Sequence, residues 1–324
     1  MTTINWAILG PGAIASDFAQ ALNNINGTIY AVGSRSIEKA QAFASKFSVK
    51  HAFGSYDSML HDENIDAVYI ATPHSNHYEY IKKSLQNGKH VLCEKAITVN
   101  GQQLEELMSL AKEKQEKQLV LMEAMTLFHM PLYAKLQQVI RSNTLGPVKM
   151  INVTFGSLKE ANPQNRFFNK ELAGGAILDI GTYALSFARF FLESQPHEVL
   201  TTVKPFETGV DEQSGIVLKN KQEQLATISL AMRSKMPKRG IVACEGGYIT
   251  VDDFPRAQAA LLTYPDGSTE EVTAGDTEHA LQYEIQAMEA AIAGQGDTHI
   301  ALSRDVMELM DTVRRQWGIT YPFE

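Results

Sequence analysis

The sequence predicts an α/β protein of two domains: a doubly wound parallel sheet over residues 1–122, and an α+β domain with a largely antiparallel open sheet over residues 123–324. Three observations support this prediction. Short apolar runs alternate with amphipathic helical segments up to Met122, and a glycine turn follows the first run. After Glu123, strand-like runs separated by turns replace the alternation.

In the first 122 residues, apolar runs predict strands at 7–9, 29–33, 50–53, 67–71, 90–94 and 119–122. Amphipathic segments predict helices at 13–23, 36–47, 56–61, 76–87 and 100–117. This alternation is typical of a parallel sheet with helices on both faces. Because ligands bind such sheets at the carboxyl ends of the strands, the residues that follow each run are the candidates for a site.

The composition is that of a globular chain long enough for two cores: 324 residues, 44% hydrophobic and 20% charged. A net charge of −8 without long Lys/Arg blocks argues against nucleic acid or an anionic membrane as the main partner and favours a small molecule. Cys93 and Cys244 make neither a metal-type spacing nor a disulfide framework, and no apolar run approaches the roughly 18 residues of a membrane span. We therefore expect a cytoplasmic protein.

The first candidate site is the turn from Gly10 to Ala15, between the first strand and the first helix. Gly10 would form the turn, Gly12 would let the main chain approach a pyrophosphate, and Ala15 would permit close packing of helix on strand. The helix N-terminus, with Ala13 and Ile14, would supply amide donors and a positive dipole end. The alternative is an ordinary glycine turn without a ligand.

Ser34, Arg35 and Ser36 follow the second run. An NAD-preferring site would place a carboxylate here for the ribose 2′-hydroxyl, and the sequence has none. Arg35 could instead bind a 2′-phosphate, with Ser34 or Ser36 adding a hydroxyl, so NADP(H) is preferred and NAD(H) is the alternative. In the other interpretation, Arg35 is a solvated surface residue and Ser36 only the N-cap of the helix at 37–47.

Thr72, Pro73, His74, Asn76 and His77 follow the fourth run and are predicted to bind the cofactor. Pro73 would stiffen the turn and Asn76 would cap the next helix, which would leave both histidines near the cofactor. The equal alternative is that the two histidines are simply packed or solvated.

Glu94 and Lys95 follow at the end of the fifth run and are predicted to bind the cofactor. A lysine directly after a buried strand points into the crevice, where desolvation and a cationic nicotinamide would lower its pKa and make it a proton donor or polariser. The alternative is a Glu94–Lys95 pair at the strand end. Cys93 is interpreted as buried packing, because nothing around it supplies a base.

After Glu123 the sequence predicts helices at 132–142, 279–293 and 303–317, and strands at 148–157, 198–204, 215–219, 225–232, 240–244, 248–251, 260–264 and 269–273. The simplest arrangement is one largely antiparallel sheet with helices on a single face. The other face would be available for self-association, and we expect a homodimer through this sheet.

Gly174 and Gly175 precede a periodic apolar stretch that predicts a helix start, approached closely by main chain or by a ligand. On this helix Asp179 and Tyr183 are four residues apart and share one face. Two polar groups among apolar neighbours are costly to bury without partners, so they could face Lys95 around one carbon–oxygen bond. In the alternative, Tyr183 is only hydrogen-bonded to Asp179.

Together these motifs resemble the Gfo/Idh/MocA family of oxidoreductases, whose members typically carry a G-x-G-x-x-A/G turn, a T-P-x-x-x-H segment and an E-K-P signature. The resemblance covers essentially the whole chain and implies an N-terminal Rossmann domain. Ala96 departs from the family pattern, because the usual proline restricts the residue before it and so helps to aim Lys95. Tyr183 stands where many members have histidine and some have tyrosine.

Within the family, the nearest resemblance is to dimeric dihydrodiol dehydrogenases and NADP-dependent sugar dehydrogenases. The loop 162–169 has a close form in the dihydrodiol subgroup. In the stretch 123–131, that subgroup usually has a tryptophan and an arginine, and this sequence has Thr126 and Phe128 in their places. This replacement argues against an aromatic diol as substrate. The predicted substrate-binding residues are Lys95, Phe128, Arg166, Asp179 and Tyr183.

The motifs and the resemblance predict hydride transfer between NADP(H) and a secondary alcohol or carbonyl of a sugar, polyol or cyclic diol. Lys95 would polarise the reacting oxygen, Tyr183 would relay the proton, and Asp179 would orient the substrate or tune Tyr183. The alternative is a cofactor-binding sensor or regulatory protein without turnover, which Ala96 favours and the intact Lys95 disfavours. No metal site is predicted.

Overall fold

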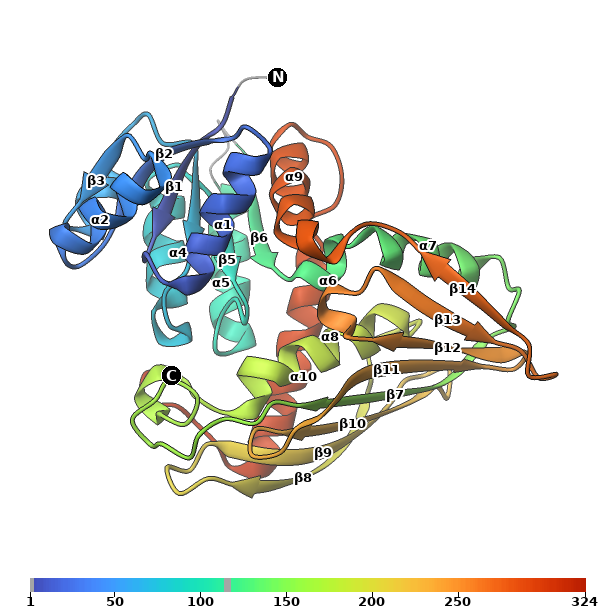
Figure 1. Cartoon of the computed structure of the whole chain (residues 1–324). Helices are drawn as coiled ribbons and strands as arrows, with labels where there is room; N and C mark the ends of the chain where they lie inside the picture. The colour runs from blue at the N-terminus through green and yellow to red at the C-terminus, as the bar shows by residue number, and fades with distance from the viewer. Residues whose placement is uncertain (1–2, 114–117) are drawn as a thin grey trace. The chain divides into compact units, whose positions relative to one another are not determined.

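The computed structural model describes residues 3–113 and 118–324 and is drawn in Figure 1. These residues divide into two compact units. The first holds the described residues of 1–98, 102–125 and 281–300, and the second holds 99–101, 126–280 and 301–324. The domain boundary at residue 122 stays a prediction. That prediction does not include the return of residues 281–300 to the first unit.

The first unit is built on a six-stranded parallel sheet in the order β3-β2-β1-β4-β5-β6. Its strands are β1 (Asn5–Leu9), β2 (Thr28–Gly33), β3 (His51–Phe53), β4 (Ala67–Ile70), β5 (His90–Glu94) and β6 (Leu121–Ala124). This order confirms the predicted doubly wound fold. The strand order reverses between β1 and β4, although all the strands of this sheet are parallel. Sheets of this kind bind ligands beyond the carboxyl ends of the strands at such a reversal.

The helices of this unit occur where the amphipathic segments predict them. They are α1 (Ala13–Asn24), α2 (Ile37–Phe47), α3 (Tyr56–Leu60), α4 (His77–Gln86) and the larger parts of α5 (Gly101–Glu113) and α9 (Ala280–Ile292). The last four residues of the predicted helix at 100–117 lie outside the described residues. Before α4, a short 3₁₀ turn, η1 (His74–Asn76), replaces the predicted first residue of that helix.

The core of the first unit joins β1, α1 and α9. Trp6 and Phe18 are completely buried, and their rings meet edge to face with centroids 5.4 Å apart. The indole of Trp6 donates to Oε1 of Glu289 in α9 at 3.1 Å, and Ile285 and Met288 of the same helix belong to this core. Residues that follow the whole antiparallel sheet in sequence therefore complete the core of the parallel one.

The second unit is built on an eight-stranded sheet in the order β14-β13-β12-β11-β7-β10-β9-β8. Its strands are β7 (Val148–Gly156), β8 (Glu198–Pro205), β9 (Asp211–Lys219), β10 (Leu225–Ala231), β11 (Met236–Cys244), β12 (Gly247–Asp252), β13 (Ala259–Thr263) and β14 (Thr269–Thr273). The β7–β10 pair is parallel and the other described pairs are antiparallel, which confirms the predicted largely antiparallel sheet.

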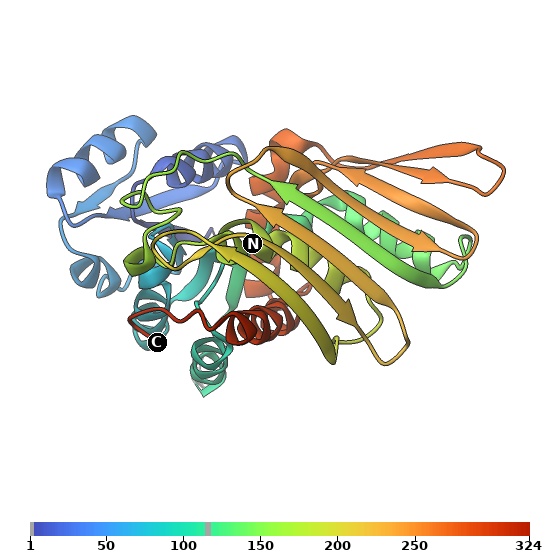
Figure 2. The same cartoon turned by 90° about the horizontal axis from the view of Figure 1, so that it is seen from below.

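Helices cover one face of this sheet, and Figure 2 shows the other face as a broad twisted surface. The helices are α6 (Thr126–His129), α7 (Pro131–Arg141), α8 (Thr182–Phe191) and α10 (Ile300–Trp317). Burial alternates along β7: Ile151 and Val153 are completely buried on the side of α8, whereas Met150 is 40% exposed. Alternation of this kind is typical of a sheet with one open face. Among the described residues, no helix combines the length and hydropathy of a membrane span.

Candidate active site

The turn after β1 contains two glycines and leads into a helix that has no side-chain cap at its N-terminus. Gly10 has a φ of 98°, and a Cβ on it would lie 3.2 Å from the carbonyl oxygen of Ala71, so this position favours glycine. Gly12 is the N-cap residue of α1, and a Cβ there would have no described atom within 4 Å. Because Gly12 supplies no side-chain acceptor, the first amides of α1, on Ala13 and Ile14, can receive an anion.

Thr72 supports the same interpretation of this turn. Its hydroxyl oxygen is buried and has no hydrogen-bond partner among the described residues. Its methyl carbon would lie 3.2 Å from a Cβ on Gly10, so Thr72 borders the turn. A buried hydroxyl without a partner is costly, and a ligand could supply that partner. The glycine turn, the first amides of α1 and Thr72 therefore fit a nicotinamide dinucleotide.

Ser36 caps α2, as one of the two interpretations of this segment predicts. Its hydroxyl accepts from the amide of Lys39 at 3.3 Å and donates to Oε2 of Glu38 at 2.6 Å. Ser34 is buried, and its Oγ accepts from the amide of Ser36 at 3.2 Å. The hydroxyl of Ser36 is thus committed to the helix end, whereas that of Ser34 keeps its donor capacity.

Arg35 is exposed at the carboxyl end of β2. Two tyrosines, Tyr56 and Tyr80, lie close enough for its charge to act on them, and their rings meet edge to face at 4.9 Å. Burial raises the pKa of both phenols, and the positive charge of Arg35 opposes that rise. A guanidinium group therefore lies beside two aromatic rings at the end of β2. A guanidinium is a hydrogen-bond donor that suits a phosphate.

Two histidines hold the main chain around Lys95. Nε2 of His74 lies 3.0 Å from the carbonyl oxygen of Lys95, and Nδ1 of His77 lies 2.9 Å from that of Ala96. The other ring nitrogen of His77, Nε2, lies 2.8 Å from the carbonyl oxygen of Thr72. His77 is completely buried, and burial lowers its pKa despite these carbonyls. This histidine therefore ties the end of β4 to the segment after β5.

The same segment has a further anchor at Ile97. The Lys95–Ala96 peptide bond is cis, and the amide of Ile97 donates to Oε1 of the buried Glu123 at 3.0 Å. Although Ala96 replaces the proline of the family signature, the side chains of His74, His77 and Glu123 hold the main chain here. Asn76 occupies the N-cap position of α4, but its side chain makes no capping hydrogen bond, so that part of the prediction is wrong.

Glu94 accepts a short hydrogen bond from the hydroxyl of Tyr69. Burial, followed by the Glu94 and Glu284 carboxylates, raises the pKa of Tyr69 well above its ordinary value. Cys93 is completely buried as predicted, and burial raises the pKa of its thiol, which suits packing and not nucleophilic chemistry.

Asp179 lies on a π-helical turn that continues into α8, and Tyr183 lies in the first turn of α8. The turn, η3, spans Ile177–Gly181, where the sequence predicts an ordinary helix start. Asp179 is 8% exposed, and its Oδ1 lies 3.8 Å from Nη1 of Arg166, so the structure brings these two predicted residues together. Tyr183 is half-buried, with its ring 6.3 Å from that of Phe155. Single π turns within helices occur frequently at functional sites.

The glycine pair before this turn is approached closely by other parts of the chain. A Cβ on Gly174 would lie 2.9 Å from the carbonyl oxygens of Phe167 and Asn169. Gly175 has a φ of 123°, and a Cβ on it would collide with Oδ1 of Asp211. The predicted close approach is therefore made by main chain and by a carboxylate.

Asp211 is a buried carboxylate that no motif of the sequence indicates. It is completely buried at the start of β9, four residues before the predicted strand, and its Oδ2 accepts from the amide of Ile177 at 2.7 Å. Burial raises its pKa to about 7, although the main-chain donors and Arg314 oppose this rise. Asp211 follows a glycine turn, and the local sequence does not distinguish a buried aspartate there from a solvent-exposed one.

Asp211 should make the stability of the fold depend on pH. Since its pKa is higher in the folded state than the ordinary 3.8, the folded chain binds more protons between pH 4 and 7, and the free energy of unfolding falls as pH rises through this window. As the pH rises from 4.5 to 8, we expect the free energy of unfolding of Asp211→Asn to increase relative to that of the wild type by up to about 4 kcal/mol. Urea unfolding of both proteins across this range measures the difference; parallel curves would contradict the assignment.

Phe128 and Thr126 lie in the interior of the second unit. Phe128 is 6% exposed and stacks on Phe190 with centroids 6.2 Å apart. The hydroxyl of Thr126 donates to the carbonyl oxygen of Pro255 at 2.9 Å. Packing therefore accounts for both side chains, and a role of Phe128 in substrate binding stays a prediction.

Comparison with known families decides the relationship. A model described as an oxidoreductase family with an NAD-binding Rossmann fold matches residues 4–122, and a GFO/IDH/MocA C-terminal domain model matches residues 133–250. The chain belongs to the GFO/IDH/MocA oxidoreductase family. The predicted resemblance is thus confirmed.

Relatives of this GFO/IDH/MocA chain match along almost its whole length. The trans-1,2-dihydrobenzene-1,2-diol dehydrogenase of Xenopus laevis is 30% identical over 331 residues, which cover 98% of this chain and 99% of that protein. The scyllo-inositol 2-dehydrogenase (NADP(+)) IolU of Bacillus subtilis (strain 168) is 29% identical over 332 residues, 98% of each chain. The solved structure of KijD10, a 3-ketoreductase from Actinomadura kijaniata in complex with NADP and TDP-benzene, matches with a TM-score of 0.86 and 23% sequence identity. The match covers 97% of this chain and 98% of the KijD10 chain, and it shows that the two proteins share a fold.

Each unit of this family member therefore carries its own set of candidates. In the first unit, the glycine turn, Thr72 and the Lys95 segment gather at the carboxyl ends of β1, β4 and β5. In the second unit, Arg166, Asp179 and Tyr183 gather around η3 and α8. No group of side chains that could hold a metal ion occurs within 3–113 and 118–324.

Proposed function

We propose that the protein catalyses hydride transfer between NADP(H) and a secondary alcohol or carbonyl of a sugar, polyol or cyclic diol. The nicotinamide, when bound, supplies or accepts the hydride. The observation that carries the proposal is the glycine turn, open at Gly12 and bordered by the unpartnered hydroxyl of Thr72, on the same sheet edge as the anchored Lys95 segment.

In this proposal the chain's own residues divide the work at one carbon–oxygen bond. Lys95 polarises the reacting oxygen and stabilises negative charge on it, because an ammonium group is a compact cation with three donors. Tyr183 relays the proton, and Asp179 orients the substrate with Arg166 beside it. The substrate class rests on the relatives, which are named as dehydrogenases of a cyclic diol and of an inositol.

A substrate panel tests the proposal. Aldoses, inositols and cyclic diols are assayed with wild-type protein by the absorbance of reduced cofactor, and the cofactor affinity is measured separately by fluorescence titration. Saturable turnover of at least one panel member is expected. Tight NADPH binding with no turnover across the panel would contradict catalysis and favour the sensor, whereas absent binding would contradict both.

Arg35→Ala should narrow the preference for NADPH over NADH. A guanidinium–phosphate contact is charge-assisted, so its loss is expected to weaken NADPH binding about 10- to 100-fold and leave NADH affinity nearly unchanged. Fluorescence titration of both cofactors measures the ratio. Lys39→Ala removes another cation of the same region, on the exposed side of α2, and serves as the control. Equal affinities of the wild type for the two cofactors would rule out this role of Arg35.

We also propose that the chain forms a homodimer through the open face of its eight-stranded sheet, in the cytoplasm. The strand registers put six exposed large apolar side chains on this face: Met150, Leu200, Val217, Leu225, Tyr248 and Leu261. Several exposed large apolar side chains on one face are typical of an interaction surface. Sedimentation equilibrium tests the assembly, and a monomer at micromolar concentration would contradict it. The two cysteines are free thiols, as suits a reducing compartment.

A further inference from the structure

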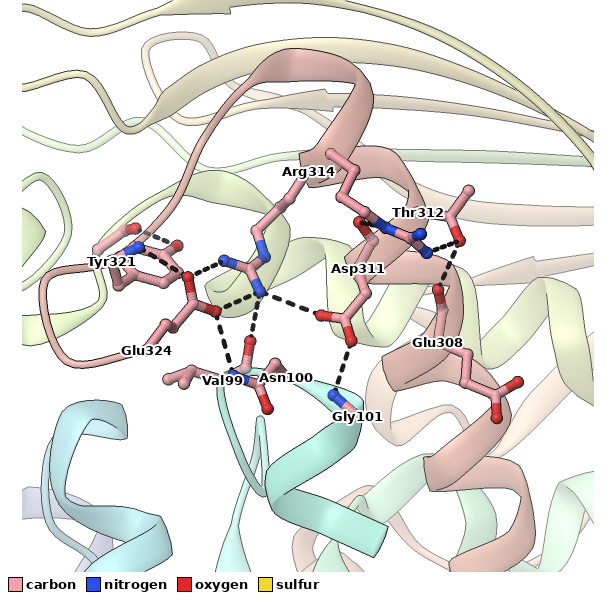
Figure 3. Close-up of polar contacts among 11 residues, drawn as sticks. Val99, Asn100, Gly101, Glu308, Asp311, Thr312, Arg314, Tyr321 and Glu324 are labelled. Carbon is pink, nitrogen blue, oxygen red and sulfur yellow. Dashed lines mark hydrogen bonds and ion pairs between the residues drawn. The ribbon is translucent and has the colours of Figure 1, made fainter.

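A buried arginine, Arg314, organises a polar network at the end of α10 (Figure 3). Its side chain is 5% exposed. The guanidinium donates to Oε1 of Glu324 at 2.6 Å, to Oε2 of Glu324 at 3.1 Å and to Oδ1 of Asp311 at 3.0 Å. Burial by itself would lower the pKa of Arg314, but these carboxylates raise it above the ordinary value, so the group is held as a cation.

The first segment that this network holds is Val99–Gly101. Nη2 of Arg314 donates to the carbonyl oxygen of Val99 at 2.7 Å, and Oδ2 of Asp311 accepts from the amide of Gly101 at 2.7 Å. Asp311 therefore serves as an acceptor for the first amide of α5, where a negative charge is favourable. Val99 comes four residues after Lys95 in the sequence.

The second segment is the glycine pair that leads to η3. The hydroxyl of Tyr321 donates to the carbonyl oxygen of Gly174 at 2.8 Å. The amide of Tyr321 donates to Oε2 of Glu324 at 2.8 Å, and the guanidinium of Arg314 lies 5.0 Å from the centre of the Tyr321 ring. Tyr321 is thus fixed at its ring and at its main chain by the same two charged residues.

Asp211 links this second segment to the turn that carries Asp179. Oδ2 of Asp211 accepts from the amide of Ile177, and a Cβ on Gly175 would lie 3.5 Å from the hydroxyl of Tyr321. The phenol and the carboxylate therefore approach the same glycine. Hydrogen bonds run from Arg314 through Glu324 and Tyr321 to the carbonyl oxygen of Gly174, three residues before η3 begins.

We propose that Arg314, Tyr321 and Glu324 are positioning residues of the redox site, a clamp that holds both the segment after Lys95 and the segment before Asp179. The proposal rests on the proposed function, since it gives the two segments their importance. In this proposal the three residues act through the main chain that they hold and not through contact with substrate. Losing the clamp lets both segments shift, and a small displacement of a reacting group lowers kcat strongly.

The clamp is sensitive to single substitutions because its charges are buried together. Removing the guanidinium would leave the Asp311 and Glu324 carboxylates close to each other without their cation. Arg314→Lys keeps the charge but loses the planar fork that reaches Val99, Asp311 and Glu324 at once. Tyr321→Phe removes one hydrogen bond, to Gly174, and leaves the ring in place.

The test compares Arg314→Gln, Arg314→Lys and Tyr321→Phe with the wild type, and Arg315→Gln is the matched control on the exposed side of α10. Kinetic constants, NADPH affinity, Tm and hydrogen–deuterium exchange are measured on each full-length protein. We expect kcat to fall about 10- to 100-fold in Arg314→Gln, with Arg314→Lys intermediate and Tyr321→Phe lowered about 3- to 10-fold. NADPH affinity is expected to stay within a factor of three, and exchange to rise in peptides covering 95–101 and 174–179.

Three results would overturn the clamp. The first is an unchanged kcat in Arg314→Gln. The second is a rise in hydrogen–deuterium exchange of Arg314→Gln that is spread over the whole chain. The third is a decrease of kcat in Tyr321→Phe that is no larger than the decrease in the amount of folded protein. Exchange is measured without substrate, so a wild type that turns over no panel member would count against the proposed function, while the exchange pattern would still decide whether the clamp holds these segments.

Discussion

Replacing Lys95 with methionine is expected to lower kcat about 10²- to 10⁴-fold, the range attributed to a positioned acid or base. Methionine keeps the length of the aliphatic stem but removes the ammonium that would polarise the reacting oxygen. The main-chain contacts of Lys95 with His74 do not involve its side chain, so the segment should keep its conformation. Steady-state assays with the best panel substrate measure the effect, and NADPH titration shows whether the cofactor still binds.

Lys39→Met controls for the loss of a surface cation in the same unit. If Lys95→Met retained more than a third of the wild-type kcat, the ammonium of Lys95 would have no part in the chemistry. If NADPH binding were lost together with activity, Lys95 would be a cofactor residue and not the group that polarises the substrate.

Tyr183→Phe is expected to reduce kcat about 10²- to 10⁴-fold because it deletes the hydroxyl that would relay the proton. The ring itself is kept, so its contact with Phe155 on β7 should persist and Tm should change little. The KM for substrate is expected to change by less than a factor of five, since the phenol would act on charge that develops in the transition state.

Tyr264→Phe is the matched control, because its hydroxyl donates to Glu270 in the β13–β14 hairpin. A Tyr183→Phe variant with a raised KM and an unchanged kcat would show that the phenol binds substrate without relaying a proton. Asp179→Asn would then be the next variant, since Asp179 lies on the π turn that leads into α8, with Arg166 beside it.

The sequence predicts most of the fold because each strand and helix carries its own periodicity. β5 and β14 begin and end at the predicted residues, and Gly10 has the backbone conformation that its motif requires. The parallel direction of the strands in the first sheet follows from the alternation of strands and helices.

Features that depend on contacts distant in sequence could not be predicted. Asp211 is identified only by its burial against Gly175, and Arg314 only by its partners at Val99 and Glu324. The π turn at Ile177–Gly181 also lacks a local signal, because its residues suit an ordinary helix equally well. His77 is recognisable as part of a motif, but its two carbonyl contacts require the ends of β4 and β5 to be side by side.

The position of α9 has a consequence for how this chain is synthesised. The core around Trp6 needs Ile285, Met288 and Glu289, so the parallel unit cannot close when the ribosome has finished its six strands. Until residues 281–300 emerge, one side of that core stays exposed, and all eight strands of the second sheet are synthesised in the interval. Closing so long a loop slows folding and prolongs the exposure of apolar surface. A fragment that ends at residue 125 should therefore aggregate when produced alone, and addition of the 281–300 segment should restore its solubility.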